Sequence, residues 1–308
     1  MFELDDIRSL AVVGLAKNVG KTVTLNWLID NLHRTRRLGI TSIGLDGEGL
    51  DQVTKTEKPE ITLYEGMVFT TAEGQYRGRQ LGSEILGIGD MTACGRLITA
   101  RVRDEGKVII TGPATTAGVR RLLDEYNNRG VELALVDGAL SRLSLASPAV
   151  TDGLVLATGA AVAVNINELV RKTKYVCQLI ELEAIGHWPL ADAIEVRSGL
   201  GGEIPELRDG ENTIIINGAV GNLFVERLRM QNRPINVVVN DFTKIFVTQD
   251  CYAQLLRSKV RIFVRYKSRL MGVTVNPWSP AGYTVNSHEL CDRLSAAINR
   301  EVIDIRNN

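Results

Sequence analysis

The sequence predicts an α/β fold in which helices flank a mostly parallel sheet. Short runs of β-branched and aliphatic residues recur along the chain, and stretches with apolar residues at helical spacing separate several of them. Hydrophobic residues make up 44% of the chain and charged residues 23%, proportions that are ordinary for a globular protein with a sizeable core. The length of 308 residues suggests one or two domains.

The first predicted strand, Leu10–Gly14, is a continuous apolar run of the kind expected for a strand that is buried on both faces. The helix Lys21–Leu32 follows, because its leucine and isoleucine residues recur at the spacing of one helical face. The same patterns predict further strands and helices in the first half of the chain: strands Ile40–Leu45, Lys107–Thr111, Leu133–Val136 and Gly153–Ala157, and helices Ala117–Asn127 and Asn167–Leu182.

The second half is less regular, and its predicted elements are strands Thr213–Ile216, Asn236–Asn240, Lys244–Thr248, Arg261–Val264 and Met271–Val275 and helix Ser287–Ile298. Only Asp241, Phe242 and Thr243 separate two of these strands, which favours a hairpin. The stretch Arg197–Glu211 is rich in glycine and charge. We therefore expect a core of residues 1–196 and a smaller α/β portion, residues 197–308, that completes the core or packs on it.

The charge, the apolar runs and the cysteine content argue against several classes of protein. Lysine plus arginine equals aspartate plus glutamate at 36 residues each, so the basic excess of a dedicated nucleic-acid or membrane-surface protein is missing. The acidic start lacks the positive region of a signal peptide, and no apolar run reaches the roughly 20 residues of a membrane helix. The four cysteines form no CxxC pair, as expected for free thiols. We expect a cytoplasmic protein.

The segment Gly14-Leu15-Ala16-Lys17-Asn18-Val19-Gly20-Lys21-Thr22 lies between a predicted strand and a predicted helix. A triphosphate needs inward-pointing N–H groups, a helix N-terminus, a lysine for the outer phosphates and a hydroxyl for Mg²⁺. Gly20, Lys21 and Thr22 supply the last three of these features. The common P-loop has four residues between its glycines, whereas this one has five. We interpret the segment as a P-loop that binds ATP and Mg²⁺. A chance Gly-Lys-Thr at an ordinary turn is the alternative.

Individual roles follow from this interpretation. Lys21 and Lys17 are the candidate catalytic cations, although Lys17 fits a solvated loop lysine equally well. The residues expected to contact the nucleotide are Asn18, Val19, Gly20, Lys21, Thr22 and Val23. Asn276, which follows the predicted strand Met271–Val275, is expected to contact an edge of the base through its side-chain amide. Asn240-Asp241 lacks the lysine of a guanine-binding NKxD sequence, so adenine is favoured.

Two aspartates follow predicted strands, where ligands of open α/β sheets collect. Asp137 ends the run Leu133–Val136, and Asp46 follows Ile43-Gly44-Leu45. We expect Thr22, Asp46 and Asp137 to hold Mg²⁺, with Asp46 also orienting a water molecule. Either aspartate could instead cap a helix or turn. The hydroxyl-rich loop Thr111–Gly118 could present donors to an anion or could be a plain turn.

The five-residue gap between glycines is similar to the loop of dethiobiotin synthetase and its ATP-dependent amidoligase relatives. Thr22, Asp46 and Asp137-Gly138-Ala139 match the magnesium-binding positions of that family, and Gly272–Asn276 resembles its adenine-selecting segment. The resemblance implies a P-loop NTPase of the dethiobiotin synthetase (SIMIBI) type. The family's substrate-binding lysine has no convincing counterpart, which puts ligase chemistry in doubt.

A broader resemblance rests on five segments: Gly14–Thr22, Thr41–Glu48, Val136–Arg142, Ser144–Asp152 and Val275–Tyr283. Together they resemble a bacterial family associated with amino-acid fermentation, a reactivase subunit for the adenosylcobalamin-dependent lysine aminomutase. The resemblance implies an aminomutase partner and a second reactivase subunit, and leaves a homodimer open. Three hypotheses follow: an ATP-driven protein that remodels its partner, an ATP-dependent ligase or kinase of a small carboxylate, and a nucleotide-binding fold kept for structure alone. The first two make the chain an NTPase.

Overall fold

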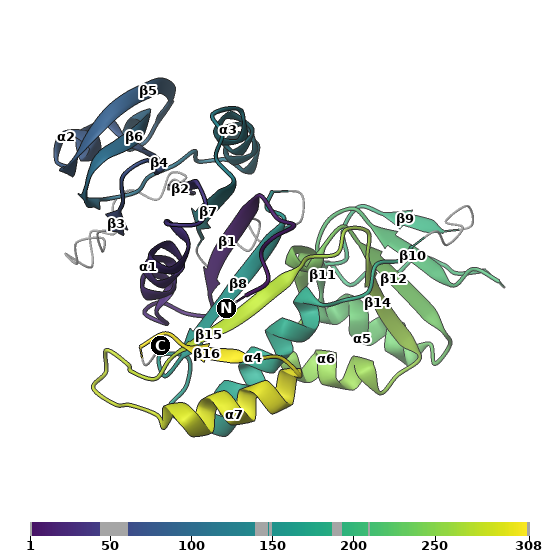
Figure 1. Ribbon diagram of the computed structural model, residues 1–308. Coiled ribbons are helices and arrows are strands. Elements are labelled where there is room, and N and C mark those ends of the chain that lie inside the picture. The colour runs from purple at the N-terminus through teal and green to yellow at the C-terminus, as the bar shows by residue number, and fades with distance from the viewer. Residues whose placement is uncertain are drawn as a thin grey trace. The chain divides into compact units, whose positions relative to one another are not determined.

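The computed structural model describes residues 2–43, 61–138, 147, 150–186, 193–208 and 210–306. Within these residues the chain is an α/β protein with a mostly parallel, mixed central sheet and flanking helices, as the sequence predicts (Figure 1). The chain forms two compact units. Unit 1 comprises residues 1–146, 150–170 and 271–308, and unit 2 comprises residues 147–149 and 171–270.

The sheet of unit 1 contains β1 (Ser9–Gly14), β2 (Leu38–Ser42), β3 (Ile61–Leu63), β4 (Val68–Ala72), β5 (Gln80–Thr92), β6 (Gly95–Val108), β7 (Leu133–Asp137), β8 (Gly153–Gly159), β15 (Leu270–Asn276) and β16 (Val302–Asp304). Their order is β16-β15-β8-β1-β7-β2-β4-β6-β3, and β5 pairs with β6 beside this path. β1 is parallel to β7 and β8, and β2 is parallel to β7 and β4. β6 is antiparallel to β3, β4 and β5, which makes the sheet mixed.

The helices of unit 1 are α1 (Lys21–Leu32), α2 (Glu73–Arg77), α3 (Thr116–Asn128), the first residues of α4 (Ile166–Ile180) and α7 (Ser287–Ile298). Helices α1 and α3 cover opposite faces of the sheet. Leu25 and Leu28 of α1 pack in the main core with Leu135 of β7. The next residue towards the start of β7, Ala134, packs against Leu122 of α3. Because neighbouring side chains of a strand point to opposite faces, the sheet lies between these two helices.

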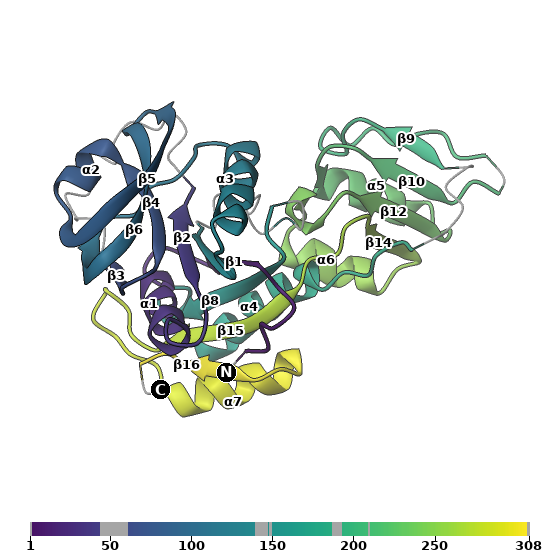
Figure 2. The same cartoon turned by 45° about the horizontal axis from the view of Figure 1, so that its top comes forward.

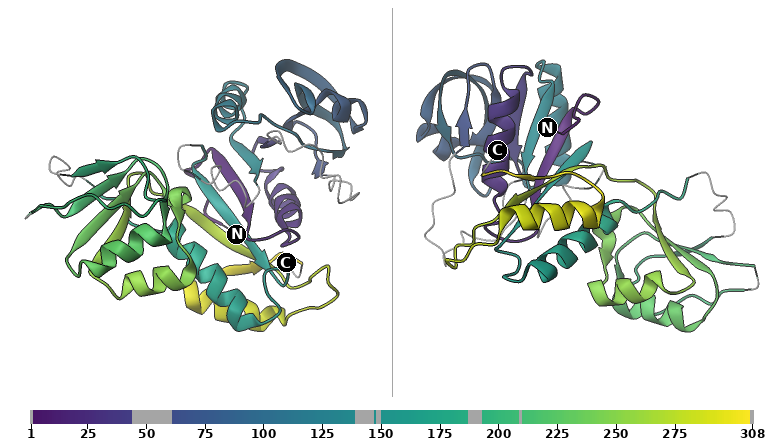
Figure 3. Two further views of the ribbon diagram at one scale, coloured as in Figure 1. Left: turned by 180° about the vertical axis from the view of Figure 1, so that it is seen from behind. Right: turned by 60° about the horizontal axis from the view of Figure 1, so that its bottom comes forward.

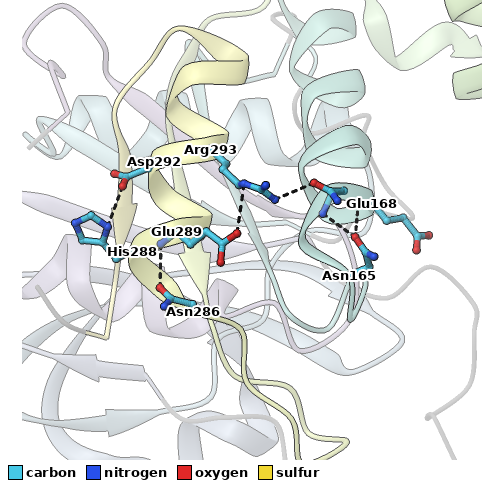
Figure 4. Close-up of polar contacts among 8 residues, drawn as sticks. Asn165, Glu168, Asn286, His288, Glu289, Asp292 and Arg293 are labelled. Atoms are coloured by element: carbon cyan, nitrogen blue, oxygen red, sulfur yellow. Dashed lines mark hydrogen bonds and ion pairs between the residues drawn. The ribbon is translucent and has the colours of Figure 1, made fainter.

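The start of α4 lies beside α7 in both views of Figure 3, and Figure 4 shows the polar contacts around the first turn of α4 and the first two turns of α7. The guanidinium of Arg293 in α7 donates to Asn167 Oδ1 in α4 over 2.8 Å and lies 3.4 Å from Glu289 Oε1. The side chain of Asn286 accepts a hydrogen bond from the N–H of Glu289 and caps α7. This cap explains why the helix begins at the next residue, as the sequence predicts.

Unit 2 has its own parallel sheet of four strands, in the order β14-β12-β10-β9. Its other elements in the described residues are the rest of α4, a two-stranded parallel pair, two further helices and a short 3₁₀ turn. The elements are β9 (Ile194–Val196), β10 (Thr213–Ile216), β11 (Val220–Gly221), α5 (Asn222–Met230), β12 (Ile235–Val239), the 3₁₀ turn Phe242–Lys244, β13 (Ile245–Phe246), α6 (Gln249–Leu256) and β14 (Val260–Val264).

The hairpin predicted around Asp241 is wrong. β12 pairs in parallel with β10 and β14, and β13 pairs in parallel with β11. The reason is the buried carboxylate of Asp241, which accepts a hydrogen bond from the N–H of Thr243 over 2.9 Å and another from Ser147 Oγ over 2.7 Å. These contacts fix a 3₁₀ turn that directs the chain away from β12.

The division into units does not coincide with the predicted boundary between residues 196 and 197, which lies inside unit 2. The chain returns to unit 1 after residue 270, because β15 and β16 belong to the large sheet. The predicted strand Lys107–Thr111 is also only partly present, since β6 ends at Val108. After Val108 the backbone carbonyls accept hydrogen bonds from side-chain hydroxyls. The hydroxyl of Thr71 donates to the carbonyl of Ile109, and the hydroxyl of Ser42 donates to the carbonyl of Ile110.

Candidate nucleotide-binding site

The segment Gly14–Thr22 lies where the order of the sheet reverses. From β1 the chain continues through α1 to β2 on one side, whereas from β8 it continues towards β15 on the other side. β1 and β8 are parallel neighbours, with Gly14 opposite Ala157. Ligands of open α/β sheets bind at the carboxyl ends of strands at such a reversal. The loop begins there, and the N–H of Leu15 donates to the carbonyl of Ala157 over 2.9 Å.

The backbone of the loop turns sharply before α1. Asn18 and Gly20 both have left-handed φ angles, 62° and 90°. Gly20 is the N-cap of α1, so no side chain caps the first turn of this helix. The first N–H groups of a helix have no partner within the helix and carry the positive end of its dipole. The start of α1 is therefore suited to bind an anion.

The side chain of Lys21 folds back over the start of the loop. A Cβ atom added to Gly14 would lie 2.7 Å from Cγ of Lys21 and 2.7 Å from Cγ2 of Val19, which is itself buried. These distances are too short for any residue other than glycine without a shift of Lys21 or Val19. Glycine at position 14 thus permits the lysine stem to run along the loop towards the end of β1.

The side chain of Asn276 supports the loop from the end of β15. A Cβ atom on Gly20 would lie 3.0 Å from Cβ of Asn276 and 3.1 Å from Cδ1 of Ile305. The Asn276 amide donates a long hydrogen bond of 3.4 Å to the carbonyl of Asn18 and accepts one of 3.2 Å from the N–H of Trp278. Only 4% of Asn276 is exposed. The structure therefore brings Asn276 to the loop, where its contacts are with protein backbone.

Asp137 lies at the carboxyl end of β7, directly beside β1. It is opposite Val12 of β1 and Ser42 of β2, and its side chain is half-buried. The N–H of Gly138 donates to the carbonyl of Val12 over 3.0 Å. Asp137 is thus at the same edge of the sheet as the loop, as a magnesium-binding aspartate must be. Asp46, the other predicted carboxylate, lies outside the described residues.

The remaining predicted residues lie on or beside the loop. Lys17 and Asn18 are exposed, Lys21 and Thr22 are half-buried, and 37% of Val23 is exposed. Within the described part of the chain, no three histidine, cysteine, aspartate or glutamate residues are grouped as metal ligands. A magnesium site here would use the hydroxyl of Thr22, the carboxylate of Asp137 and oxygen atoms of the nucleotide, which suits an ion that binds through one or two carboxylates and phosphates.

The hydroxyl-rich loop before α3 has a structural role. Thr115 Oγ1 accepts a hydrogen bond from the N–H of Gly118 and caps α3. Thr111 is buried and its hydroxyl donates to the side-chain oxygen of Gln75. A Cβ atom on Gly112 would collide with the backbone of Ser42, so glycine allows the loop to pass β2 closely. The plain-turn interpretation of this loop is favoured.

Ile305 was not expected at the site, because sequence patterns did not reveal the short strand β16 that precedes it. The apolar run Val302-Ile303 was the available signal.

Comparison with known proteins finds no family model and no curated relative that matches this chain. Among the described residues, no helix has both the length and the apolar character that a membrane crossing requires. All four cysteines are free thiols.

Proposed function

We propose that this chain is a P-loop NTPase that binds ATP with Mg²⁺ at Gly14–Thr22. The observation that carries the proposal is the position of Lys21, which begins α1 and folds its side chain back over Gly14. A lysine in this arrangement can reach phosphates that the uncapped N–H groups of α1 also bind. The location at the reversal of the strand order supports the proposal independently.

Each residue then has a defined task. The loop N–H groups and Lys21 hold the β- and γ-phosphates, and Thr22 and Asp137 hold Mg²⁺. Asp46 orients a water molecule, and Lys17 stabilises charge that develops on the transferred phosphoryl group. Catalysis of this kind depends on positioning and charge stabilisation, with little covalent chemistry by the protein.

We further propose that the nucleotide controls binding to an adenosylcobalamin-dependent lysine aminomutase, for which this chain would be a reactivase subunit. The proposal rests on the sequence resemblance, and unit 2 offers a partner surface in support of it. Leu200, Leu223 and Phe246 are 55%, 46% and 64% exposed. All three lie near Gly221: Leu200 is within 3.3 Å of a Cβ placed there, Leu223 is two residues further on, and Phe246 pairs with Gly221. Grouped exposed apolar residues often mark protein-binding sites.

Isothermal titration with ATP and GTP in the presence of Mg²⁺ tests the first proposal, and we expect ATP to bind more tightly. A protein that takes up neither nucleotide would contradict it. The same titration with the aminomutase present tests the second. We expect nucleotide affinity to change in its presence, because an effector and a ligand that are coupled must influence each other equally. Unchanged affinity, together with no capture of the aminomutase with or without ATP, would refute the partner.

The alternative is an ATP-dependent ligase or kinase of a small carboxylate. The five-residue gap between Gly14 and Gly20 and the sequence Asp137-Gly138-Ala139, both of the dethiobiotin synthetase type, favour it. Release of ADP that is stimulated by one of a panel of amino acids, diamines and dicarboxylates would support this activity. A uniform response across the panel would exclude it for those classes of compound.

A further inference from the structure

We propose that the indole ring of Trp278 is the surface on which the base of the nucleotide stacks. This inference rests on the nucleotide-binding function proposed above and extends it to the base. Trp278 comes two residues after the end of β15, and 39% of it is exposed. A large aromatic ring with this much contact with solvent is a candidate for ligand binding, since every base has a π-face that stacks on aromatic side chains.

Two separate segments of unit 1 bring this ring close to the P-loop. Asn276 and Ile305 both lie against Gly20, at 3.0 Å and 3.1 Å from a Cβ atom placed there. Trp278 follows the first of them, and its N–H donates to the Asn276 side chain over 3.2 Å. Arg306 follows the second, and its guanidinium carbon lies 5.4 Å from the centre of the Trp278 ring. The segment that carries the aromatic ring and the segment that carries the cation therefore both pass Gly20, the N-cap of α1. Figures 1 and 2 show the ends of β15 and β16 from which these segments continue.

The loop that carries Trp278 is held in place. The N–H of Ser279 donates to the carbonyl of Tyr283 over 3.0 Å, and the N–H of Val285 donates to that of Pro277 over 2.9 Å. The hydroxyl of Tyr283 donates to the carbonyl of Ala160 over 2.9 Å, just after β8. The loop is thus tied to the strand that borders β1 at the reversal of the sheet. A ring that is already fixed loses little freedom when a ligand stacks on it.

Asn276, the residue expected to read the base, is less suited to the task. It is 4% exposed, and its amide contacts the backbone of Asn18 and Trp278. We therefore assign Asn276 to positioning of the loop and base contact to Trp278. Stacking is stronger for the larger purine ring than for a pyrimidine. The wild-type protein should accordingly bind ATP more tightly than CTP, and loss of the indole ring should reduce that difference.

Isothermal titration of the full chain with MgATP and with magnesium tripolyphosphate, which has no base, tests the inference. We expect Trp278→Ala to weaken ATP binding by about tenfold and to leave tripolyphosphate binding unchanged. Trp278→Phe should retain most of the affinity for ATP. Trp27→Phe is the matched control, because Trp27 packs against Phe2 and the main core, and it should change neither affinity.

The two ligands separate the possible failures. Equal loss of ATP and tripolyphosphate affinity in Trp278→Ala would mean that Trp278 only supports the loop, and the inference would be overturned. Unchanged affinity for ATP would overturn it as well. If the wild-type protein binds tripolyphosphate, but binds ATP no more tightly than tripolyphosphate, the phosphate site is supported and the base site is refuted. If it binds neither ligand, the proposed function itself fails. Fluorescence is a second readout: ATP should quench the emission of wild type and Trp27→Phe, and Trp278→Phe should lose this quenching.

Discussion

The hydroxyl of Thr24 in α1 lies 2.8 Å from the hydroxyl of Thr274 in β15, and both side chains are fully buried. This hydrogen bond joins the helix that follows the loop of the candidate site to the strand that ends at Asn276. The two segments that form the candidate site are therefore connected within the core as well as at the loop.

Replacement of either threonine alone should destabilise unit 1. Thr24→Val or Thr274→Val leaves the other hydroxyl buried without its partner, which costs about 1–3 kcal/mol. The double variant should lose less than the sum of the two single variants, because no polar group is then stranded. Urea unfolding followed by tryptophan fluorescence measures these free energies. Strictly additive losses would show that the two hydroxyls do not interact.

Lys21→Ala should weaken MgATP binding by about 10- to 100-fold, since a charge-assisted contact to phosphate contributes about 1.5–3 kcal/mol. Lys17→Ala removes a positive charge from the same loop, and it should affect ATP turnover more than ATP binding. Isothermal titration and phosphate release measure the two effects. Lys21→Ala with undiminished binding would leave the loop without a phosphate-binding role, and would favour a fold kept for structure alone.

Thr22→Ala and Asp46→Asn should have different effects. Loss of the Thr22 hydroxyl should make nucleotide binding independent of Mg²⁺, because this hydroxyl is the proposed protein ligand nearest the start of α1. Asp46→Asn should leave binding intact and reduce turnover, since its proposed role is to orient water. Titrations with and without EDTA and a steady-state ATPase assay distinguish them. Full turnover in Asp46→Asn would refute the role of that carboxylate.

Much of the fold could be predicted because local patterns and tertiary packing agree. The predicted bounds of α1 and α7 match the structure, and their buried leucines lie at helical spacing. The candidate P-loop, Gly14–Thr22, could be picked out because its glycines, lysine and threonine are consecutive in sequence or nearly so. Contacts such as that between Asn276 and Asn18 join residues distant in sequence, and patterns along the chain cannot reveal them.

The long strand β5 could not be predicted for a physical reason. β5 contains several glycines and many exposed residues, and irregularities interrupt its pairing with β6, so regular alternation is lost. The 3₁₀ turn after β12 depends on a hydrogen bond from Ser147 to Asp241, residues that are far apart in the sequence. The short gap Asp241-Phe242-Thr243 between two predicted strands favoured a hairpin, because the sequence does not reveal the long-range contact that determines the turn.

The phenol of Tyr175 should contribute to stability at alkaline pH. Burial raises the pKa of Tyr175 from 10.0 to about 12, and its hydroxyl donates to the carbonyl of Val247. Because the pKa is raised in the folded state, this contribution is fully present below pH 10 and is lost as pH rises through about 12. Tyr175→Phe should therefore flatten the dependence of unfolding free energy on pH in this range. Tyr266→Phe, at an exposed position, is the control and should leave the dependence unchanged.

Gly20→Ala should lower the affinity for ATP in addition to the loss of stability that its left-handed backbone angle causes. Gly20 and Gly66 have similar left-handed φ angles of 90° and 84°, so alanine at either position costs about 1–2 kcal/mol of backbone strain. A Cβ atom on Gly66 would meet nothing within 4 Å, whereas one on Gly20 would press on Asn276 and Ile305. Both variants should lose stability, but only Gly20→Ala should also lose ATP affinity, because it displaces the residues that support the loop. Urea unfolding and isothermal titration of the two variants measure this difference. Equal ATP affinity in both variants would mean that the contacts of Asn276 and Ile305 with Gly20 do not matter for nucleotide binding.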